Sequence, residues 1–231
     1  MDGTLTVPVL DFHAMRTRTG ILTGDLLDAI YAIDDLVEQK RLLDVIDQVE
    51  REGNDKLQFQ PNLESCLTEL YKLSPNSETS SPLSTTTNSA VSESDDSEKM
   101  VAKVLQHAAI VTRNSQESLQ FFLDKLSHHA FIQMFTMKLS RDFRPYKPAP
   151  DPLLHIANRL HIPVQNCLMV GDSYHDIDSA KKTGGMQSCL FTSLDHWDEK
   201  HDQCVLEHEP DFVIHDLMDL VDIVKSCNET N

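Results

Sequence analysis

CLMVGDSYHD, at residues 167–176, is the stretch that decides the fold. Its first four residues are apolar and predict a buried strand, and a helical pattern follows from Asp176 to about Thr183. A buried strand that turns tightly into a helix is the repeating unit of parallel α/β sheets. Carboxylates on such a turn are suitable oxygen ligands for Mg²⁺. The alternative is an Asp-rich turn that only caps the helix after it.

The same alternation of short apolar runs and helical patterns extends on both sides of this stretch. Strands are expected at 108–111, 131–135, 186–191 and 210–214, and helices at 61–73, 116–126, 152–160 and 216–225. This order predicts an α/β protein with a doubly wound, Rossmann-like parallel sheet that is covered on both faces. Ligands bind such sheets at the carboxyl ends of the strands.

Residues 25–53 are helical in pattern, with Leu36, Leu43, Ile46 and Val49 three or four residues apart among charged neighbours. The pattern predicts two helices that are separated near residues 33–35.

Residues 74–99 differ from the rest of the chain, because 13 of these 26 residues are Ser or Thr and five are acidic. So little apolar surface cannot offset the entropy lost on ordering, which predicts a disordered surface insertion within the core.

Charge and cysteine content restrict the classes of partner. The chain has 231 residues and a formal net charge of -17, which disfavours nucleic acid and anionic membranes as partners. Its five cysteines form no Cys-x-x-Cys pair, which indicates a reducing, cytoplasmic location. No apolar run approaches the ~20 residues of a membrane-spanning helix. A phosphorylated substrate would need locally placed cations.

Three further motifs accompany the Gly171-Asp172 turn: Asp2-Gly3-Thr4-Leu5 at the start of the chain, Thr112-Arg113-Asn114 after the apolar run at 108–111, and Lys147-Pro148. In this order the motifs resemble those of the haloacid dehalogenase-like hydrolases, which are mostly Mg²⁺-dependent phosphatases. That resemblance covers nearly the whole chain apart from residues 74–99. The family's first motif reads Asp-x-Asp-Gly-Thr-Leu, so Met1 stands at x. We therefore expect an apolar strand before Met1 that ends in the nucleophilic Asp.

The resemblance implies a role for each matching residue. Asp2 would be the general acid and base of an aspartyl-phosphate mechanism. Thr112 and Lys147 would complete the catalytic set, the first by holding a phosphoryl oxygen and the second by steadying the nucleophile and the transferring group. Arg113 and Asn114 would line the substrate site with them. Thr112 could instead belong only to the start of the helix after it, and Lys147 to an ordinary surface loop.

The implied Mg²⁺ site consists of Asp172 as a direct ligand, the backbone carbonyl of Asp2, and Asp176 in a second-shell or water-bridged position. The resemblance also predicts a small helical cap at residues 10–58 on a core of residues 1–9 and 59–231, although this helical segment could merely pack on the core. The expected function is hydrolysis of a small phosphorylated metabolite, provided that the nucleophile is present. The rival hypothesis is a non-catalytic binding or regulatory module with the same fold.

Overall fold

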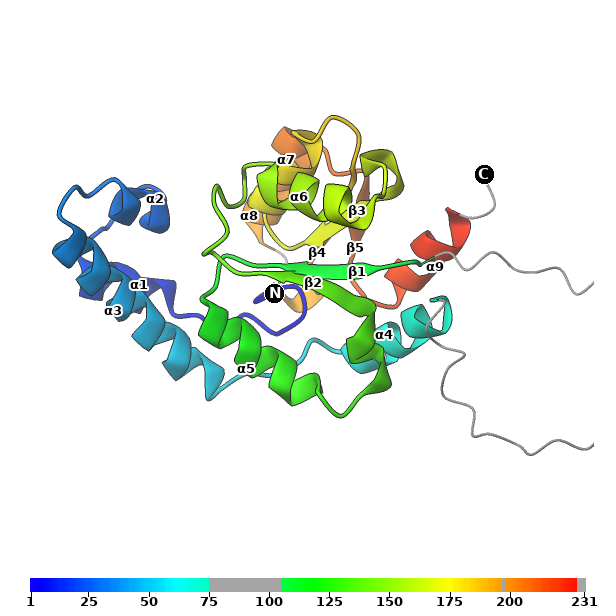
Figure 1. Cartoon of the computed structure of the whole chain (residues 1–231), viewed down its shortest axis with the longest axis horizontal. Helices are drawn as coiled ribbons and strands as arrows, with labels where there is room; N and C mark the ends of the chain where they lie inside the picture. The colour runs from blue at the N-terminus through cyan, green and yellow to red at the C-terminus, as the bar shows by residue number, and fades with distance from the viewer. Residues whose placement is uncertain (75–104, 197, 228–231) are drawn as a thin grey trace, which may run out of the picture.

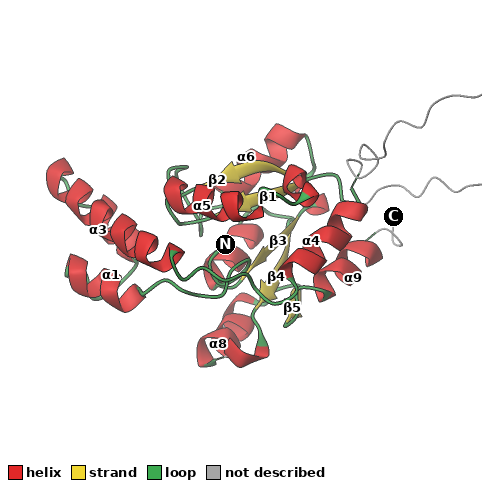
Figure 2. Cartoon of the chain, turned by 90° about the horizontal axis from the view of Figure 1, so that it is seen from below, coloured by secondary structure: helices red, strands yellow, loops and turns green. Residues whose placement is uncertain are grey.

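The computed structural model describes residues 1–74, 105–196 and 198–227 and shows an α/β fold with parallel strands (Figures 1 and 2). Strands β1 (Ala108–Val111) and β2 (Phe135–Leu139) form one parallel pair. Strands β3 (Leu168–Gly171), β4 (Gln187–Phe191) and β5 (Phe212–Ile214) form a second parallel group. The predicted parallel α/β class is confirmed, with the described strands in two hydrogen-bonded groups.

The helices that accompany the strands are amphipathic and pack on the sheets through their apolar faces. They are α4 (Leu63–Lys72), α5 (Gln116–Leu126), α6 (Asp151–Leu160), α7 (Tyr174–Lys181), α8 (Glu199–His208) and α9 (Asp219–Ser226). In α5, Leu119, Phe122 and Leu126 follow the helical repeat and are fully buried in the main core. None of the described helices is long and apolar enough to cross a membrane.

The strand expected at 131–135 is wrong in position. Residues Ala130–Met134 form a 3₁₀ turn, η2, because Phe131 and Met134 lie one such turn apart and are both buried in the core. The strand begins at Phe135, where buried or half-buried residues alternate with the exposed Thr136 and Lys138. The period-two pattern of a strand therefore starts where the expected strand ends.

Three helices near the N-terminus pack around an apolar cluster of their own, to one side of the sheet (Figure 1). They are α1 (Phe12–Thr19), α2 (Leu26–Tyr31) and α3 (Leu36–Asn54). The two helices predicted within 25–53 correspond to α2 and α3. Helix α1 was not predicted, because Met15 is its single buried residue and the sequence has no apolar repeat there.

The residues just after α4 and those just before β1 lie next to each other. The backbone N–H of Leu105 donates to the carbonyl of Leu73, with 3.4 Å between nitrogen and oxygen. Apart from Ser74, the predicted insertion at 74–99 lies outside the described residues.

Candidate active site

Lys147 joins the ends of two strands that belong to different groups. Its Nζ donates to the carbonyl of Val111 at the end of β1 (2.9 Å) and to Oδ1 of Asp176 in the first turn of α7 (2.5 Å). Both Lys147 and Asp176 are buried. Two of the predicted site residues therefore form an ion pair at the carboxyl ends of the strands, where α/β proteins bind their ligands.

The Asp2-Gly3-Thr4 segment lies against the turn after β3. The hydroxyl of Thr4 donates to Oδ1 of Asp172 (2.5 Å), and the side-chain amide of Gln60 donates to the carbonyl of Gly3 (2.8 Å). Gly3 has a φ of +84°, and a Cβ there would lie 2.2 Å from Oδ2 of Asp172. Only glycine suits that conformation and that approach, which explains why Gly follows Asp2.

Burial and like charge set the ionisation of the three carboxyls. Burial raises the pKa of Asp2, and burial together with the neighbouring Asp176 carboxylate raises the pKa of Asp172. Burial also acts to raise the pKa of Asp176, but the Lys147 ammonium outweighs it, so this pKa is lowered. Asp176 therefore carries the negative charge of the ion pair, while the half-buried Asp2 and Asp172 interact electrostatically and form no ion pair with a side chain of the described residues.

Asp176 also serves the structural role that the sequence left open. Its Oδ2 accepts from the backbone N–H (3.2 Å) and the hydroxyl (3.0 Å) of Ser173, and together they form a capping box at the start of α7. The helix cap and the ion pair to Lys147 use different oxygens of one carboxylate. The capping interpretation is confirmed for this residue, and its part in an Mg²⁺ site stays a prediction.

Thr112 is buried just beyond β1 but is not the cap of α5. Ser115 is that N-cap, because its hydroxyl accepts from the backbone N–H of Ser118 (3.2 Å). The hydroxyl of Thr112 instead donates to Oδ1 of Asn114 (3.2 Å) and accepts from the backbone N–H of that residue (3.1 Å). Thr112 and Asn114 thus hold one turn together, next to the residue whose carbonyl Lys147 binds.

Arg113 extends away from this turn toward the N-terminal helices. Its Nη2 lies 2.7 and 2.6 Å from the two carboxylate oxygens of Asp25, the N-cap residue of α2, and its Nη1 lies 2.7 Å from Nε2 of His175. Sequence reasoning missed both Asp25 and Thr4. Thr4 could have been found as part of the first motif, whereas nothing local in the sequence marks Asp25 as more than a helix cap.

The donor set is compatible with Mg²⁺. Among the residues that the structure describes, no three His, Cys, Asp or Glu side chains gather as a complete metal site. Mg²⁺, however, takes only one or two carboxylates and keeps several waters. Two half-buried carboxyls with raised pKa values, Asp2 and Asp172, are oxygen donors whose mutual repulsion a divalent cation would offset.

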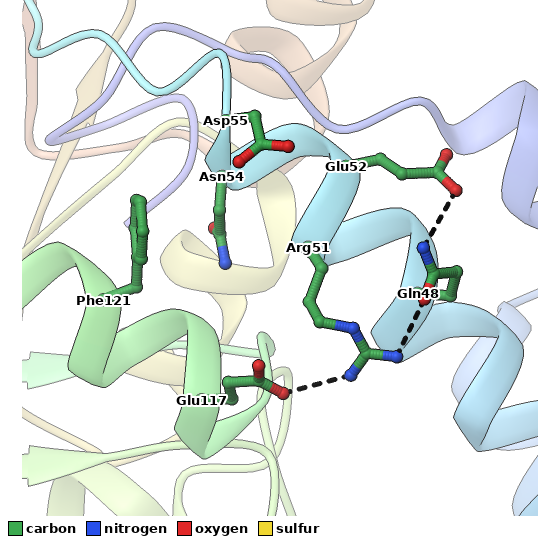
Figure 3. Close-up of a pocket in the computed structure, with 7 residues that line it drawn as sticks. All are labelled: Gln48, Arg51, Glu52, Asn54, Asp55, Glu117 and Phe121. Carbon is green, nitrogen blue, oxygen red and sulfur yellow. Dashed lines mark hydrogen bonds and ion pairs between the residues drawn. The ribbon is translucent and has the colours of Figure 1, made fainter.

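A surface pocket between α3 and α5 lies apart from these residues (Figure 3). Arg51 pairs with Glu117 across it at 3.1 Å. None of the predicted site residues lines this pocket, whose walls are Gln48, Arg51, Glu52, Asn54, Asp55, Glu117 and Phe121.

The protein is of the α/β class, and its candidate site lies at the carboxyl ends of the parallel strands, where a lysine and several carboxyls are found.

The family model described as haloacid dehalogenase-like hydrolase matches residues 80–190. Over its whole length the chain is 29% identical to a haloacid dehalogenase-like hydrolase domain-containing protein of Arabidopsis thaliana and covers 84% of that relative. The chain is therefore similar to the haloacid dehalogenase-like hydrolases in sequence.

Two other proteins are similar to the chain, one in part of its sequence and one in its fold. A phosphoglycolate phosphatase of Nitrosococcus oceani is 29% identical over 114 residues, which are 49% of this chain and 48% of that protein. The crystal structure of a hydrolase from Pseudomonas syringae has the same fold, with a TM-score of 0.65 at 17% identity over 97% of this chain and 95% of the other.

Proposed function

We propose that this protein is a Mg²⁺-dependent phosphatase that acts on a small phosphorylated metabolite through an aspartyl-phosphate. The observation that carries the proposal is the buried ion pair of Lys147 and Asp176 at the carboxyl ends of the parallel strands. Asp172 lies close enough to interact electrostatically with both, and Asp2 interacts in the same way with Asp172. These side chains come from separate parts of the sequence, and three of the four family motifs supply them. The similarity to a phosphoglycolate phosphatase supports this reaction class.

Each residue has one task in the proposed reaction. Asp2 gives a proton to the leaving oxygen and later takes one from the attacking water. Lys147, held in place by the Val111 carbonyl and by Asp176, steadies the charge on the phosphoryl group. The hydroxyl of Thr112 and the backbone N–H of Arg113 bind phosphoryl oxygens. The nucleophile of the proposed reaction is the first aspartate of the family motif Asp-x-Asp-Gly-Thr-Leu.

Asp172 and the backbone carbonyl of Asp2 would hold the Mg²⁺ ion. When bound, the ion supplies positive charge beside the phosphoryl oxygens and offsets the negative charge of the carboxylates. Asp176, which Lys147 and Ser173 already engage, supports the turn from a second-shell or water-bridged position.

Residues 10–58 form the cap of the proposed enzyme. Helices α1 to α3 have an apolar cluster of their own, and the N-cap of α2 reaches the Arg113 side chain beside the site. A cap in this position excludes water and contacts the part of the substrate that leaves.

The test is a Mg²⁺-dependent assay with p-nitrophenyl phosphate on two forms: residues 1–231, and the same chain extended at its N-terminus by an apolar strand that ends in Asp. The extended form should turn over substrate. Asp2→Asn should lower its kcat about 10²- to 10⁴-fold, the usual range for a general acid and base. Asp172→Asn should abolish the Mg²⁺ dependence.

Asp35→Asn is the matched control, because it makes the same change at an exposed aspartate that caps α3 and lies outside the candidate site. Its kcat should equal that of the parent. Absence of turnover in both forms, or an Asp172→Asn variant that behaves as the parent does, would exclude the phosphatase.

A further inference from the structure

The guanidinium of Arg113 has hydrogen-bond partners for two of its three nitrogens among the described residues. One nitrogen, Nη2, contacts both oxygens of Asp25, and Nη1 lies against Nε2 of His175, which accepts because a guanidinium can only donate. The third nitrogen, Nε, is buried and has no hydrogen-bond partner among the described residues. A buried donor without a partner is costly, and its presence beside a bound carboxylate points to a ligand that uses it.

The three residues of this cluster come from three different parts of the fold. Arg113 directly follows Thr112, His175 lies on the first turn of α7 after Asp172, and Asp25 begins α2. Their side chains are 21%, 17% and 23% exposed, respectively. The cluster therefore lies where α2 meets the two strand-end turns that carry the proposed phosphoryl and metal residues, and part of it is open to solvent.

We propose that Arg113 is the specificity-determining residue for a carboxylate on the substrate, and that the Asp25 carboxylate occupies this subsite when substrate is absent. The proposal rests on the phosphatase function above and narrows its substrates to phosphorylated carboxylic acids. The substrate carboxylate replaces Asp25 and takes Nε together with Nη2, in the two parallel hydrogen bonds that a guanidinium forms best with a carboxylate.

The present occupant of the subsite decides the chemistry of the ligand. A neutral sugar or alcohol that displaced Asp25 would leave a largely buried guanidinium without its counter-ion, which is strongly unfavourable. A substrate carboxylate replaces the Asp25 carboxylate with a group of the same charge, and it also accepts a hydrogen bond from Nε. Formal charge supports this reading, because a chain with a net charge of -17 needs a local cation for a substrate that is itself a multiple anion.

If Asp25 competes with the ligand, then removing its charge should strengthen binding. Asp25→Asn keeps the cap of α2, because Asn is as good an N-cap as Asp, but it removes the internal counter-ion of Arg113. An ion pair that only fastened α2 to the core would give the opposite result, since its loss would loosen the site.

The experiment is calorimetric titration, in the presence of Mg²⁺, with two matched pairs of inert phosphonates: phosphonoacetate against ethylphosphonate, and 3-phosphonopropionate against propylphosphonate. Each pair differs by a carboxylate in place of a methyl group. The parent should bind one carboxylated member about 10- to 100-fold more tightly than its partner, the range of a charge-assisted hydrogen bond. Arg113→Gln should bind the two members equally, and Asp25→Asn should bind the carboxylated member about 10-fold more tightly than the parent does.

Two controls separate this effect from a change in charge or in helix capping. The first control is Arg144→Gln, which removes a positive charge from a guanidinium that lies 3.1 Å from the centre of the Tyr31 ring. The second is Asp35→Asn, which makes the same change at an equivalent helix cap. Both controls should behave as the parent does. Thermal melting of each variant identifies any that fails to fold.

Equal binding of the two members by the parent, no binding of either, or an Asp25→Asn variant that weakens both alike would overturn the proposal. Calorimetry needs no turnover, so the carboxylate preference stands or falls separately from the phosphatase assay. Turnover of p-nitrophenyl phosphate without any carboxylate preference would leave the phosphatase intact and exclude the subsite.

Discussion

Besides the exposed pair of Arg51 and Glu117, two ion-pair clusters among the described residues join the N-terminal helices to the rest of the molecule, and their central pairs differ in burial. The first, here called the anchor, consists of Arg141 with Asp47 and Glu50 of α3. The second, the latch, consists of Arg113 with Asp25 and His175. In the anchor the side chains of Arg141 and Glu50 are only 4% and 3% exposed, whereas those of Arg113 and Asp25 in the latch are 21% and 23% exposed.

The anchor is also more richly bonded than the latch. Glu50 accepts from the backbone N–H of Ser115 (2.9 Å) and from the hydroxyl of Ser118 (3.1 Å), in addition to Arg141. This fixes the C-terminal half of α3 to the start of α5. The difference indicates that α3 stays in place while the α2 end of the same segment can release. Substrate entry would then need only the exposed contacts to open.

Loss of the anchor should have the largest effect on stability. Arg141→Met leaves Glu50 buried without its counter-ion, and breaking a buried pair in this way costs about 3–5 kcal/mol. Urea denaturation measures the free energy of unfolding. Arg51→Met is the matched control, because its pair with Glu117 is exposed and should contribute about 1 kcal/mol or less. Equal losses for the two variants would show that the anchor is no stronger than a surface pair.

Loss of the latch should have a smaller effect on stability than loss of the anchor, and the effect should be confined to α2. We expect Arg113→Gln to lower the free energy of unfolding by about 1–2 kcal/mol, because the hydrogen bonds that are lost are charged but partly solvated. Hydrogen exchange should accelerate in α2 and remain unchanged in the second half of α3. Faster exchange in both helices would mean that the segment opens as one unit, and the distinction between anchor and latch would fail.

A smaller local effect is expected at Tyr146, whose hydroxyl donates to Oδ1 of Asp28 in α2 (2.5 Å). Tyr146→Phe keeps the aromatic ring, which lies near the ring of Tyr31 and beneath Arg113, and removes only the hydroxyl. We expect a loss of about 1 kcal/mol, since Asp28 remains accessible to water. Urea denaturation and hydrogen exchange of α2 check this value. A loss as large as that of Arg141→Met would contradict it.

The smallest effect is a change with pH in the stability that Asp25 contributes, and this change should begin only in acid. Burial acts to raise the pKa of the Asp25 carboxyl, but its contacts with the Arg113 guanidinium and the backbone N–H of Asp28 outweigh burial and hold the pKa well below its usual value. A lowered folded-state pKa adds stability that is complete above the unfolded value of ~3.9 and is lost as the pH falls toward the folded value. The stability difference between the parent and Asp25→Asn should therefore be constant above about pH 5 and shrink below about pH 4. A difference that grows in acid would contradict the sign.

The sequence was most informative where a buried apolar run decides the local structure. The bounds of β1 and α5 were predicted exactly as observed, because each has a strong apolar pattern. Helices α1 and α8 were missed because each buries a single side chain, Met15 and Cys204. Capping and tertiary contacts, which no periodicity reveals, hold such helices.

The candidate site shows the same division. Asp2, Lys147 and Asp172 were expected to meet because each follows a motif at a strand end, and the structure places them near one another. Their catalytic roles remain predictions. Asp25 was not expected, because its contact with Arg113 joins residues 88 positions apart and depends on how α2 lies against the core.

The hydrogen bond between Leu105 and Leu73 has a consequence for protein engineering. The chain departs and re-enters within the length of one hydrogen bond, so the core sets no span that residues 75–104 must bridge. The length of a loop between such fixed points affects stability only through closure entropy, about 0.6 kcal/mol for each doubling. A fluorescent reporter or an affinity tag could therefore replace these residues while the candidate site, at the opposite, carboxyl ends of the strands, keeps its geometry.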